Sequence, residues 1–237
     1  MKLEIGYNHS FEIRKVCYKG TCNTSFSVLY LSDLHLNGFS KTIIARLILT
    51  IKDLNPDIIL LGGDYVDTKN GLHYLNTLMI SLSNRKNVFA IAGNHDTFLG
   101  IKRIKKIITD NFGIWIENDS ITFKLKDTTI QIDGNRPGKI PNDNVFSILC
   151  LHKPIDLDKN RKYNLTFAGH LHGSQFVFWK SGAKLYPGKL FYKWNILETK
   201  QNTCHYYISK GLGDTIPIRY NCRKDVIFVN VEASDHP

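Results

Sequence analysis

The sequence lacks the features of a secreted or membrane-spanning chain. Its first residues, MKLEIGYNHSFEIRK, carry charges where a secretory signal would need an apolar segment. Its longest apolar stretches, at residues 43–51 and 58–61, are much shorter than the roughly 20 residues that a spanning helix needs. We therefore expect a soluble protein that stays in the cytoplasm.

The sequence also lacks the pattern of a disulfide framework. Its five cysteines are an odd number, and they contain no Cys-x-x-Cys pair. In a cytoplasmic chain of 237 residues, such cysteines are typical of reduced thiols. Internal repeats, low-complexity segments and linkers rich in Pro, Gly or Ser are absent as well. We therefore expect a single domain over residues 1–237.

Acidic residues are scarce relative to basic ones. Lys and Arg number 31 against 21 Asp and Glu, which gives a formal net charge of +10. This excess suits phosphorylated substrates, nucleic acid or an anionic membrane surface. A compositional bias toward Lys, Asn and Ile would produce the same excess. The charge alone does not choose among these interpretations.

Short apolar runs alternate with amphipathic segments in the first half of the chain. The apolar runs predict strands at residues 26–31, 58–61 and 88–92. Apolar positions at helical spacing predict helices at about residues 43–54, 72–82 and 101–108. Ser40 is expected to cap the first helix and Pro56 to end it.

From about residue 113 the pattern changes to strands. They are predicted at residues 114–116, 121–125, 129–132, 146–151, 165–168, 175–178, 205–209 and 226–231. We expect this half to be mostly antiparallel. Together the two halves predict an α/β fold in which two sheets pack together with helices outside.

Polar clusters follow five of the predicted strands. They are DLH (33–35), GDYVD (63–67), GNHD (93–96), the single His152 and GHLHG (169–173). Because the carboxyl ends of strands in open α/β sheets line one crevice, these side chains are expected to meet there. A buried Asp or His without a partner costs several kcal/mol, and metal ions would supply the partner. The mixed oxygen and nitrogen donors suit manganese, iron or zinc.

Each cluster alone has a simpler interpretation. The segments 33–35 and 63–67 could be capping or βα turns, and residues 93–96 could be a turn with a surface histidine. His152 could be a hydrogen-bonded, partly buried histidine. His170 and His172 are harder to explain in this way, because alternation in an extended segment places both imidazoles on one side. All five clusters at strand ends favour a shared metal site.

In these five motifs the sequence resembles the calcineurin-like metallophosphoesterases, over about residues 26–178. The resemblance implies a four-layer αββα sandwich of two mixed sheets flanked by helices, with further C-terminal strands in residues 200–233. It also implies two divalent metal ions, with manganese favoured and iron or zinc as alternatives. One ion would be held by Asp33, His35, Asp64 and His172. The other would be held by Asp64, Asn94, His152 and His170, with Asp64 bridging.

The implied reaction is hydrolysis of a phosphoester or phosphoanhydride bond. Two metal ions roughly 3.5–4 Å apart hold the phosphoryl oxygens and acidify a bridging water, which attacks phosphorus in line. His95 would donate a proton to the leaving oxygen. Asp67 and Asp96 are expected to orient imidazoles, although Asp96 could equally cap the following helix. Asn94, Arg136 and Arg219 are the candidate substrate contacts.

The C-terminal part narrows the resemblance. GHLHGSQ (169–175) and YISKGLGDTIPIRYN (207–221) are similar to a bacterial branch of the family. That branch includes phosphoesterases of unassigned substrate and a UDP-2,3-diacylglucosamine pyrophosphatase. The Pro-Pro-Glu that usually follows the second motif is replaced by RKD (223–225), so the substrate does not transfer directly.

Residues 176–194, FVFWKSGAKLYPGKLFYKW, interleave seven aromatics with four lysines. This composition suits peripheral contact with a bilayer or a lipid-linked phosphate, at the inner face of the membrane. Nucleic acid could use the same chemistry, and a core of aromatics with solvated lysines is the structural alternative. We therefore expect a phosphorylated small-molecule or lipid-linked substrate. A phosphodiesterase or nuclease, and a non-catalytic scaffold of the same fold, are the competing functions.

Overall fold

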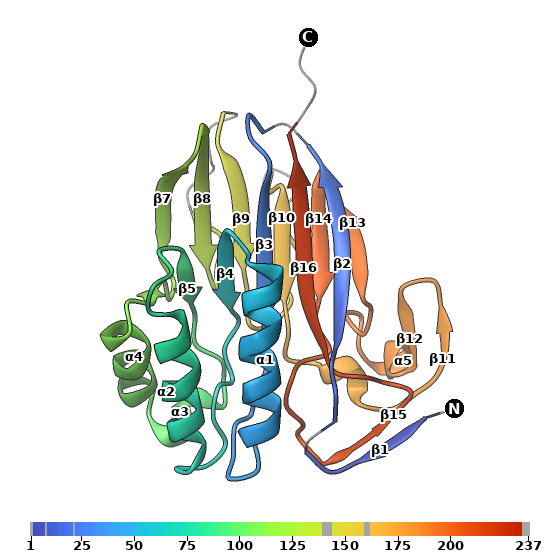
Figure 1. The fold of residues 1–237 in the computed structure, drawn as a ribbon. Helices are drawn as coiled ribbons and strands as arrows, with labels where there is room; N and C mark the ends of the chain where they lie inside the picture. Colours follow the sequence, from blue (N-terminus) through green and yellow to red (C-terminus); the bar gives the residue numbers. More distant parts are fainter. Residues whose placement is uncertain (1, 8, 21, 139–143, 159–161, 234–237) are drawn as a thin grey trace.

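Two six-stranded sheets pack face to face in the computed structural model of the chain (Figure 1). The structure describes residues 2–7, 9–20, 22–138, 144–158 and 162–233. The core between the sheets contains the stacked rings of Tyr30 and Phe167, whose centroids lie 5.3 Å apart. The Tyr30 hydroxyl donates a hydrogen bond of 2.9 Å to the carbonyl of Leu151, so its polar atom is satisfied inside the core.

The first sheet has the strand order β2-β16-β3-β4-β5-β6. Its strands are β2 (Glu12–Lys19), β16 (Asp225–Glu232), β3 (Phe26–Leu31), β4 (Ile58–Leu61), β5 (Val88–Ala90) and β6 (Ile114–Trp115). All neighbouring pairs are parallel except β16 and β3. The helices on its outer face are α1 (Lys41–Leu54), α2 (Gly71–Leu82) and α4 (Ile101–Asp110), with the short α3 (Asp96–Leu99) before α4 (Figure 1).

The second sheet has the order β13-β14-β10-β9-β8-β7. Its strands are β13 (Glu198–Gln201), β14 (Cys204–Ile208), β10 (Leu165–Ala168), β9 (Phe146–Cys150), β8 (Thr128–Gly134) and β7 (Ser120–Leu125). The expectation of a mostly antiparallel second half was wrong, because the four central strands are parallel and only the edge pairs are antiparallel. Every residue of β9 and β10 is buried, as is typical of parallel strands covered on both faces.

The predicted α/β fold of two mixed sheets with flanking helices is confirmed. The two outer faces are covered differently in the described part of the chain. Helices cover the first sheet, whereas Leu157, Tyr163 and Trp194, from irregular segments, pack on the outer face of the second. Among the described residues, no helix combines the length and the apolar character that crossing a bilayer requires.

Helix α1 begins after Ser40, as predicted, but the Ser40 hydroxyl does not cap it. That oxygen accepts the backbone N–H of Asn37 at 2.9 Å instead and closes the turn that precedes the helix. The helix ends at Leu54, because Asn55 adopts a left-handed conformation with φ of 43°. Pro56 therefore follows the end of the helix.

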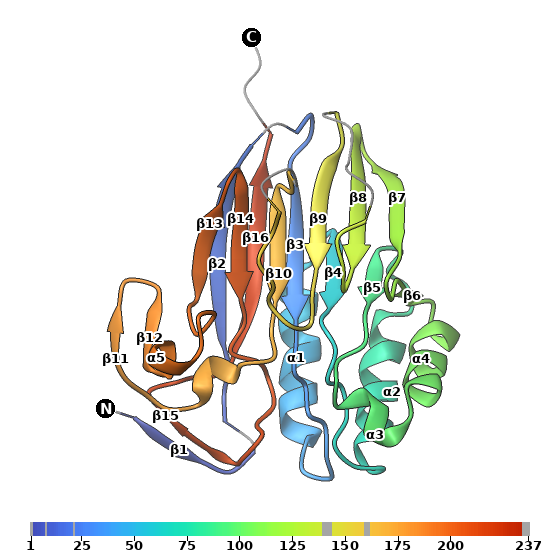
Figure 2. The ribbon, with the colours of Figure 1, turned by 180° about the vertical axis from the view of Figure 1, so that it is seen from behind.

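Two small ribbons and two short helices complete the described structure. They are the pair β1 (Leu3–Ile5) and β15 (Ile218–Tyr220), the hairpin β11 (Val177–Ser181) and β12 (Lys184–Pro187), the 3-10 helix η1 (His172–Ser174) and α5 (Gly188–Phe191). They lie at the lower end in Figure 2, toward which β3, β4 and β9 point. The strands of the sandwich and these additions therefore meet at one end of the molecule.

Candidate metal centre

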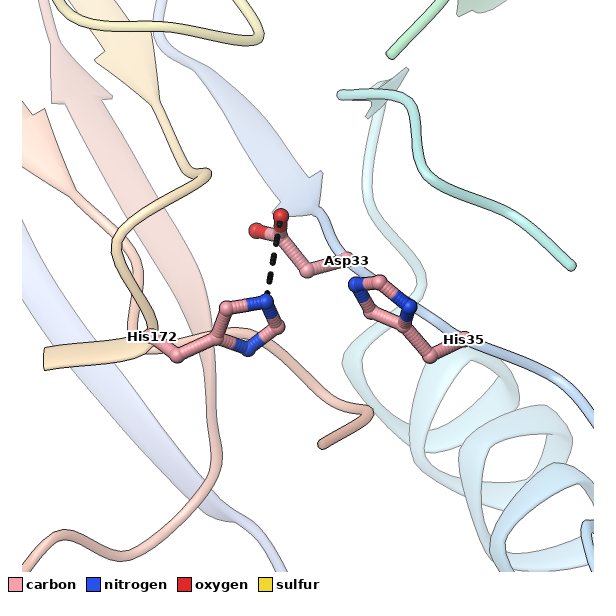
Figure 3. A group of neighbouring side chains, drawn as sticks. All are labelled: Asp33, His35 and His172. Atoms are coloured by element: carbon pink, nitrogen blue, oxygen red, sulfur yellow. Dashed lines mark ion pairs between the residues drawn. The ribbon is translucent and has the colours of Figure 1, made fainter. Parts of the chain in front are cut away.

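The five predicted clusters converge at the carboxyl ends of β3, β4, β5, β9 and β10. A first group of potential ligands joins Asp33, His35 and His172, whose ligand atoms lie within 4.8 Å of one another (Figure 3). All three side chains are buried. His172 Nε2 lies 3.8 Å from Asp33 Oδ1. Residues far apart in the sequence thus supply two nitrogens and a carboxylate to one point.

A second group joins Asp64, His152 and His170 by the same criterion. His152 Nε2 lies 3.3 Å from Asp64 Oδ2 and 2.8 Å from Asn94 Oδ1. His170 Nδ1 lies 3.2 Å from the same His152 nitrogen. Asp64 Oδ2 is also 3.7 Å from His35 Nε2 in the first group. The Asp64 carboxylate therefore lies between the two groups.

The side chains fit a pair of divalent ions. His35 Nε2 is buried, and it has no hydrogen-bond partner among the residues that the structure describes. Glycines leave room around the carboxylates, since a Cβ added at Gly93 would lie 2.1 Å from Asp64 Oδ1 and one at Gly169 2.3 Å from Asp33 Oδ2. Imidazole nitrogens and carboxylate oxygens in this mixture suit borderline metals such as manganese, iron and zinc.

The electrostatics of the centre favour positive charge. Burial by itself would raise the pKa of Asp64, but the hydrogen bond and charge of His152 lower it to about 2. Burial likewise opposes protonation of His152, yet Asp64 and Asp33 raise its pKa to about 9. Burial lowers the pKa of His172 to about 4, so this imidazole is neutral near pH 7. Asp64 and His172 are therefore in the forms that bind metal ions, whereas a metal ion bound by His152 would displace the proton of that imidazole.

Most of the potential ligands have a left-handed backbone. Positive φ values are found at Asp33 (53°), His35 (42°), Asp64 (55°), His170 (74°) and His172 (50°). This conformation is uncommon for residues other than glycine, and it persists where the surroundings enforce it. Hydrogen bonds hold the backbone of these loops: the Asp33 N–H donates to the Gly63 carbonyl and the His35 N–H to the Asp64 carbonyl, both at 3.0 Å. The His170 N–H donates to both Asp33 carboxylate oxygens at 3.0 Å.

Asp67 and Asp96 have different environments. Asp67 Oδ1 lies 2.6 Å from His35 Nδ1, which leaves His35 Nε2 directed toward Asp64. Asp96 accepts three backbone N–H groups, from Asp64 (3.0 Å), Tyr65 (2.8 Å) and Gly93 (2.7 Å). The Asp96 carboxylate therefore binds amides of the two ligand-bearing loops, and it neither orients an imidazole nor caps α3, the helix that it begins.

His95 lies beside the first group and is partly exposed. Its ring centroid is 5.0 Å from that of His35, at nearly a right angle. One of its nitrogens is within 4.8 Å of ligand atoms of His35 and Asp67. The neighbouring Asn94 is exposed. These two side chains therefore face the open side of the centre.

Sequence reasoning missed a residue that ties the loops together. Asn135, after β8, accepts the His152 N–H through Oδ1 at 2.8 Å and donates through Nδ2 to the Ala92 carbonyl at 2.7 Å. The Glu117 carboxylate accepts from the same Asn135 amide and from the Ala92 N–H. The available signal was the segment GNR (134–136), which follows a predicted strand as the other clusters do.

The predicted contact between Arg219 and a substrate phosphate was wrong. The Arg219 side chain is 1% exposed, and its guanidinium donates to the carbonyls of Cys222, Lys210 and Gly213 and to the Asp214 carboxylate. These contacts occupy the donors that a phosphate would need. Arg136 is exposed, and its Nε and Nη2 donate to one backbone carbonyl, that of Asn118.

Replacing Arg219 is expected to destabilise the fold. Arg219→Leu would remove the guanidinium from the buried Asp214, which keeps Lys224 Nζ at 2.6 Å, and would remove hydrogen bonds to three buried carbonyls. We expect a loss of about 3–5 kcal/mol. The free energy of unfolding from urea titration would measure this loss. The matched control is Arg136→Leu at an exposed position, which should change stability by less than about 0.5 kcal/mol. Equal effects of the two substitutions would contradict the assignment.

Comparisons with known proteins agree with this geometry. The model of a family described as calcineurin-like phosphoesterase matches residues 26–221, which contain all five motifs. The chain is 31% identical to YkoQ of Bacillus subtilis, an uncharacterized metallophosphoesterase, over 85% of this chain and 82% of that protein. It is 28% identical to YkuE of the same organism, also an uncharacterized metallophosphoesterase, over 89% and 80%. It is 25% identical to the phosphodiesterase YaeI of Escherichia coli, over 87% and 82%.

Proposed function

Because the chain belongs to the calcineurin-like phosphoesterase family, we propose that it hydrolyses a phosphoester or phosphoanhydride bond with two divalent ions. The observation that carries the proposal is the place of the Asp64 carboxylate. Its Oδ2 lies 3.7 Å from His35 Nε2 and 3.3 Å from His152 Nε2, so one oxygen can serve both groups of ligands. A bridging carboxylate is what a paired-ion centre needs.

Each ion would have its own set of donors. The first would be held by Asp33, His35, Asp64 and His172, and the second by Asp64, Asn94, His152 and His170. Manganese is the proposed ion, with iron or zinc as alternatives. When bound, the pair supplies Lewis acidity to the phosphoryl oxygens and a water of lowered pKa.

The side chains on the open side of the centre would act on the substrate. His95 would hold the proton that the leaving oxygen takes, since its ring is partly exposed and lies beside the ligands. With its oxygen on the second ion, the exposed Asn94 side chain would offer its amide N–H groups to a phosphoryl oxygen. We assign Arg136, an exposed arginine that directly follows Asn135, to a substrate phosphate.

The proposed substrate is a lipid-linked or nucleotide-linked diphosphate, such as UDP-2,3-diacylglucosamine, at the cytoplasmic face of the membrane. The exposed aromatics and lysines of residues 176–194 favour it. The alternative is a phosphodiester of soluble nucleotides or nucleic acid, which the name of YaeI, a phosphodiesterase, favours. A panel of phosphomonoesters, phosphodiesters and nucleoside diphosphate conjugates, assayed with added manganese, would separate them.

The same assay tests the non-catalytic alternative. Two manganese ions bound per chain and turnover of a generic chromogenic phosphodiester are expected. Fewer than two ions, with no turnover of any member of the panel, would instead favour an interaction scaffold. All seven potential ligand positions carry donor side chains, which is the reason for expecting an enzyme.

Asp67→Asn is expected to lower kcat/KM by roughly 10- to 100-fold, the usual effect of removing a carboxylate that orients a metal-bound histidine. The amide keeps the shape of the side chain but loses the charge that holds His35 Nδ1 at 2.6 Å. Manganese titration of the purified variant should show weaker binding in parallel. Asp53→Asn, at an exposed position on α1, is the matched control, and an unchanged affinity in Asp67→Asn would contradict the positioning role.

A further inference from the structure

The hairpin β11–β12 and α5 expose a group of large apolar side chains, which we call the aromatic lobe. It consists of Phe178, Trp179, Leu190, Phe191 and Tyr192, each between 51% and 77% exposed. Three of them, at positions 190–192, are consecutive. A run of exposed large apolar residues is unfavourable in water and commonly marks a contact surface.

Most of the apolar surface of the aromatic lobe lies outside the small core of the hairpin. Val177 and Leu185 point inward and form a small buried cluster with Cys222. On the outer side, the Trp179 ring stacks on Tyr186, with centroids 5.0 Å apart and planes 4° from parallel. The hairpin thus has its own core, and the exposed apolar side chains are additional to it.

The aromatic lobe adjoins the metal centre. His172 is the first residue of η1, and β11 begins five residues later, at Val177. A Cβ added at Gly188, where α5 starts, would lie 2.2 Å from Ser174 Oγ, so α5 packs directly against η1. On the other side of the centre, the Phe98 ring is 80% exposed and lies edge-on to His95, with centroids 5.5 Å apart. The open side of the centre therefore lies between exposed apolar groups.

The charge around the aromatic lobe is positive. Residues 176–194 contain four lysines and no acidic residue, in a chain whose formal net charge is +10. Lys180 and Lys184 are exposed, and no ion pair is found for them within the described ranges. Lys193 is paired with Asp156. Lysines around Trp and Tyr side chains are typical of proteins that bind the headgroup region of anionic membranes.

We propose that the aromatic lobe inserts into the headgroup region of an anionic phospholipid bilayer and holds the metal centre against that surface. The hairpin, α5 and β1 lie at the end of the molecule toward which β3, β4 and β9 point (Figure 2), so a bilayer bound at the aromatic lobe would lie near the metal centre. A phosphate on a lipid or lipid-linked headgroup would then reach His95 without leaving the interface. This last step rests on the proposed function, whereas the membrane contact does not.

Vesicle sedimentation tests whether the aromatic lobe binds an anionic bilayer. The full chain should bind phosphatidylglycerol vesicles, and bind phosphatidylcholine vesicles much more weakly. Leu190→Ser/Phe191→Ser should lower the affinity for phosphatidylglycerol vesicles by about tenfold or more, because two side chains lose their apolar burial. The matched control is Leu49→Ser/Ile80→Ser, two apolar residues on α1 and α2 that are 60% and 56% exposed. It should bind as the unmodified chain does.

Three outcomes would contradict the proposed membrane contact of the aromatic lobe. They are a failure of the unmodified chain to bind either vesicle, an equal loss of affinity in the control variant, and tighter binding to a single-stranded oligonucleotide than to phosphatidylglycerol vesicles. The lobe variant should hydrolyse a soluble chromogenic phosphodiester at the unmodified rate, which shows that it is folded. If the unmodified chain hydrolyses phosphoesters but does not bind vesicles, the proposed membrane contact alone is contradicted. If it binds vesicles but hydrolyses no phosphoester, the proposed function is contradicted instead.

Discussion

Asp64→Asn is expected to lower kcat/KM by about a thousandfold or more while leaving the fold intact. The substitution removes the negative charge that lies between His35 and His152. Each proposed ion would then lose the shared carboxylate that offsets part of its positive charge. In the unmodified chain Asp64 Oδ1 accepts a hydrogen bond of 2.8 Å from the His95 N–H. The amide oxygen of the asparagine can accept the same hydrogen bond. Steady-state kinetics, bound manganese per chain and circular dichroism are the measurements.

Two results together would identify Asp64 as the carboxylate that bridges the two ions. Manganese content should fall below two ions per chain, while the circular dichroism spectrum stays unchanged. Asp53→Asn on α1 again serves as the control, and it should keep full activity. Unmodified kinetics from a metal-loaded Asp64→Asn enzyme would show that no carboxylate bridge is required.

His95→Ala is expected to lower kcat by roughly 100- to 10,000-fold on a substrate whose leaving group is an alkoxide. The imidazole would supply the proton that such an oxygen needs. A substrate that releases p-nitrophenolate needs little help, so its kcat should fall much less. Bound manganese should stay at the unmodified level, because His95 is not in either group of proposed ligands.

The comparison of the two leaving groups separates proton donation from other roles. His73→Ala, at an exposed position on α2, is the matched histidine control and should have no effect. Equal losses on the two substrates would contradict a proton donor. They would point instead to a role in binding the phosphoryl group.

The metal centre could be predicted from the sequence because each ligand cluster directly follows an apolar run. Such runs form buried strands, and the carboxyl ends of neighbouring parallel strands meet at one edge. From these apolar runs the sequence places Asp33 and Asp64 after strands β3 and β4, and His152 after strand β9. Their distances and hydrogen bonds required the structure, since the sequence contains no signal for how two sheets face each other.

Other features could not be predicted because their causes are not local. The strands β9 and β10 read as short apolar runs, which fit parallel and antiparallel neighbours equally well. Strand β2, at the edge of its sheet, alternates partly buried and exposed residues, and its partly buried positions include the charged Glu12 and Arg14, so its apolar signal is weak. Arg219 is basic, and only its buried pairing with Asp214, five residues earlier, distinguishes it from a surface arginine such as Arg136.

The division of the ligands between the two sheets has a consequence for the lifetime of the chain. Asp33 follows a strand of the first sheet and His172 follows a strand of the second, so the proposed metal ions would bind only after both halves have assembled. By mass action, a ligand at about 100 times its dissociation constant adds about 2.7 kcal/mol to the stability of the folded state. Chelation would therefore remove stability together with activity, and a metal-starved cell would lose more of this chain to proteolysis.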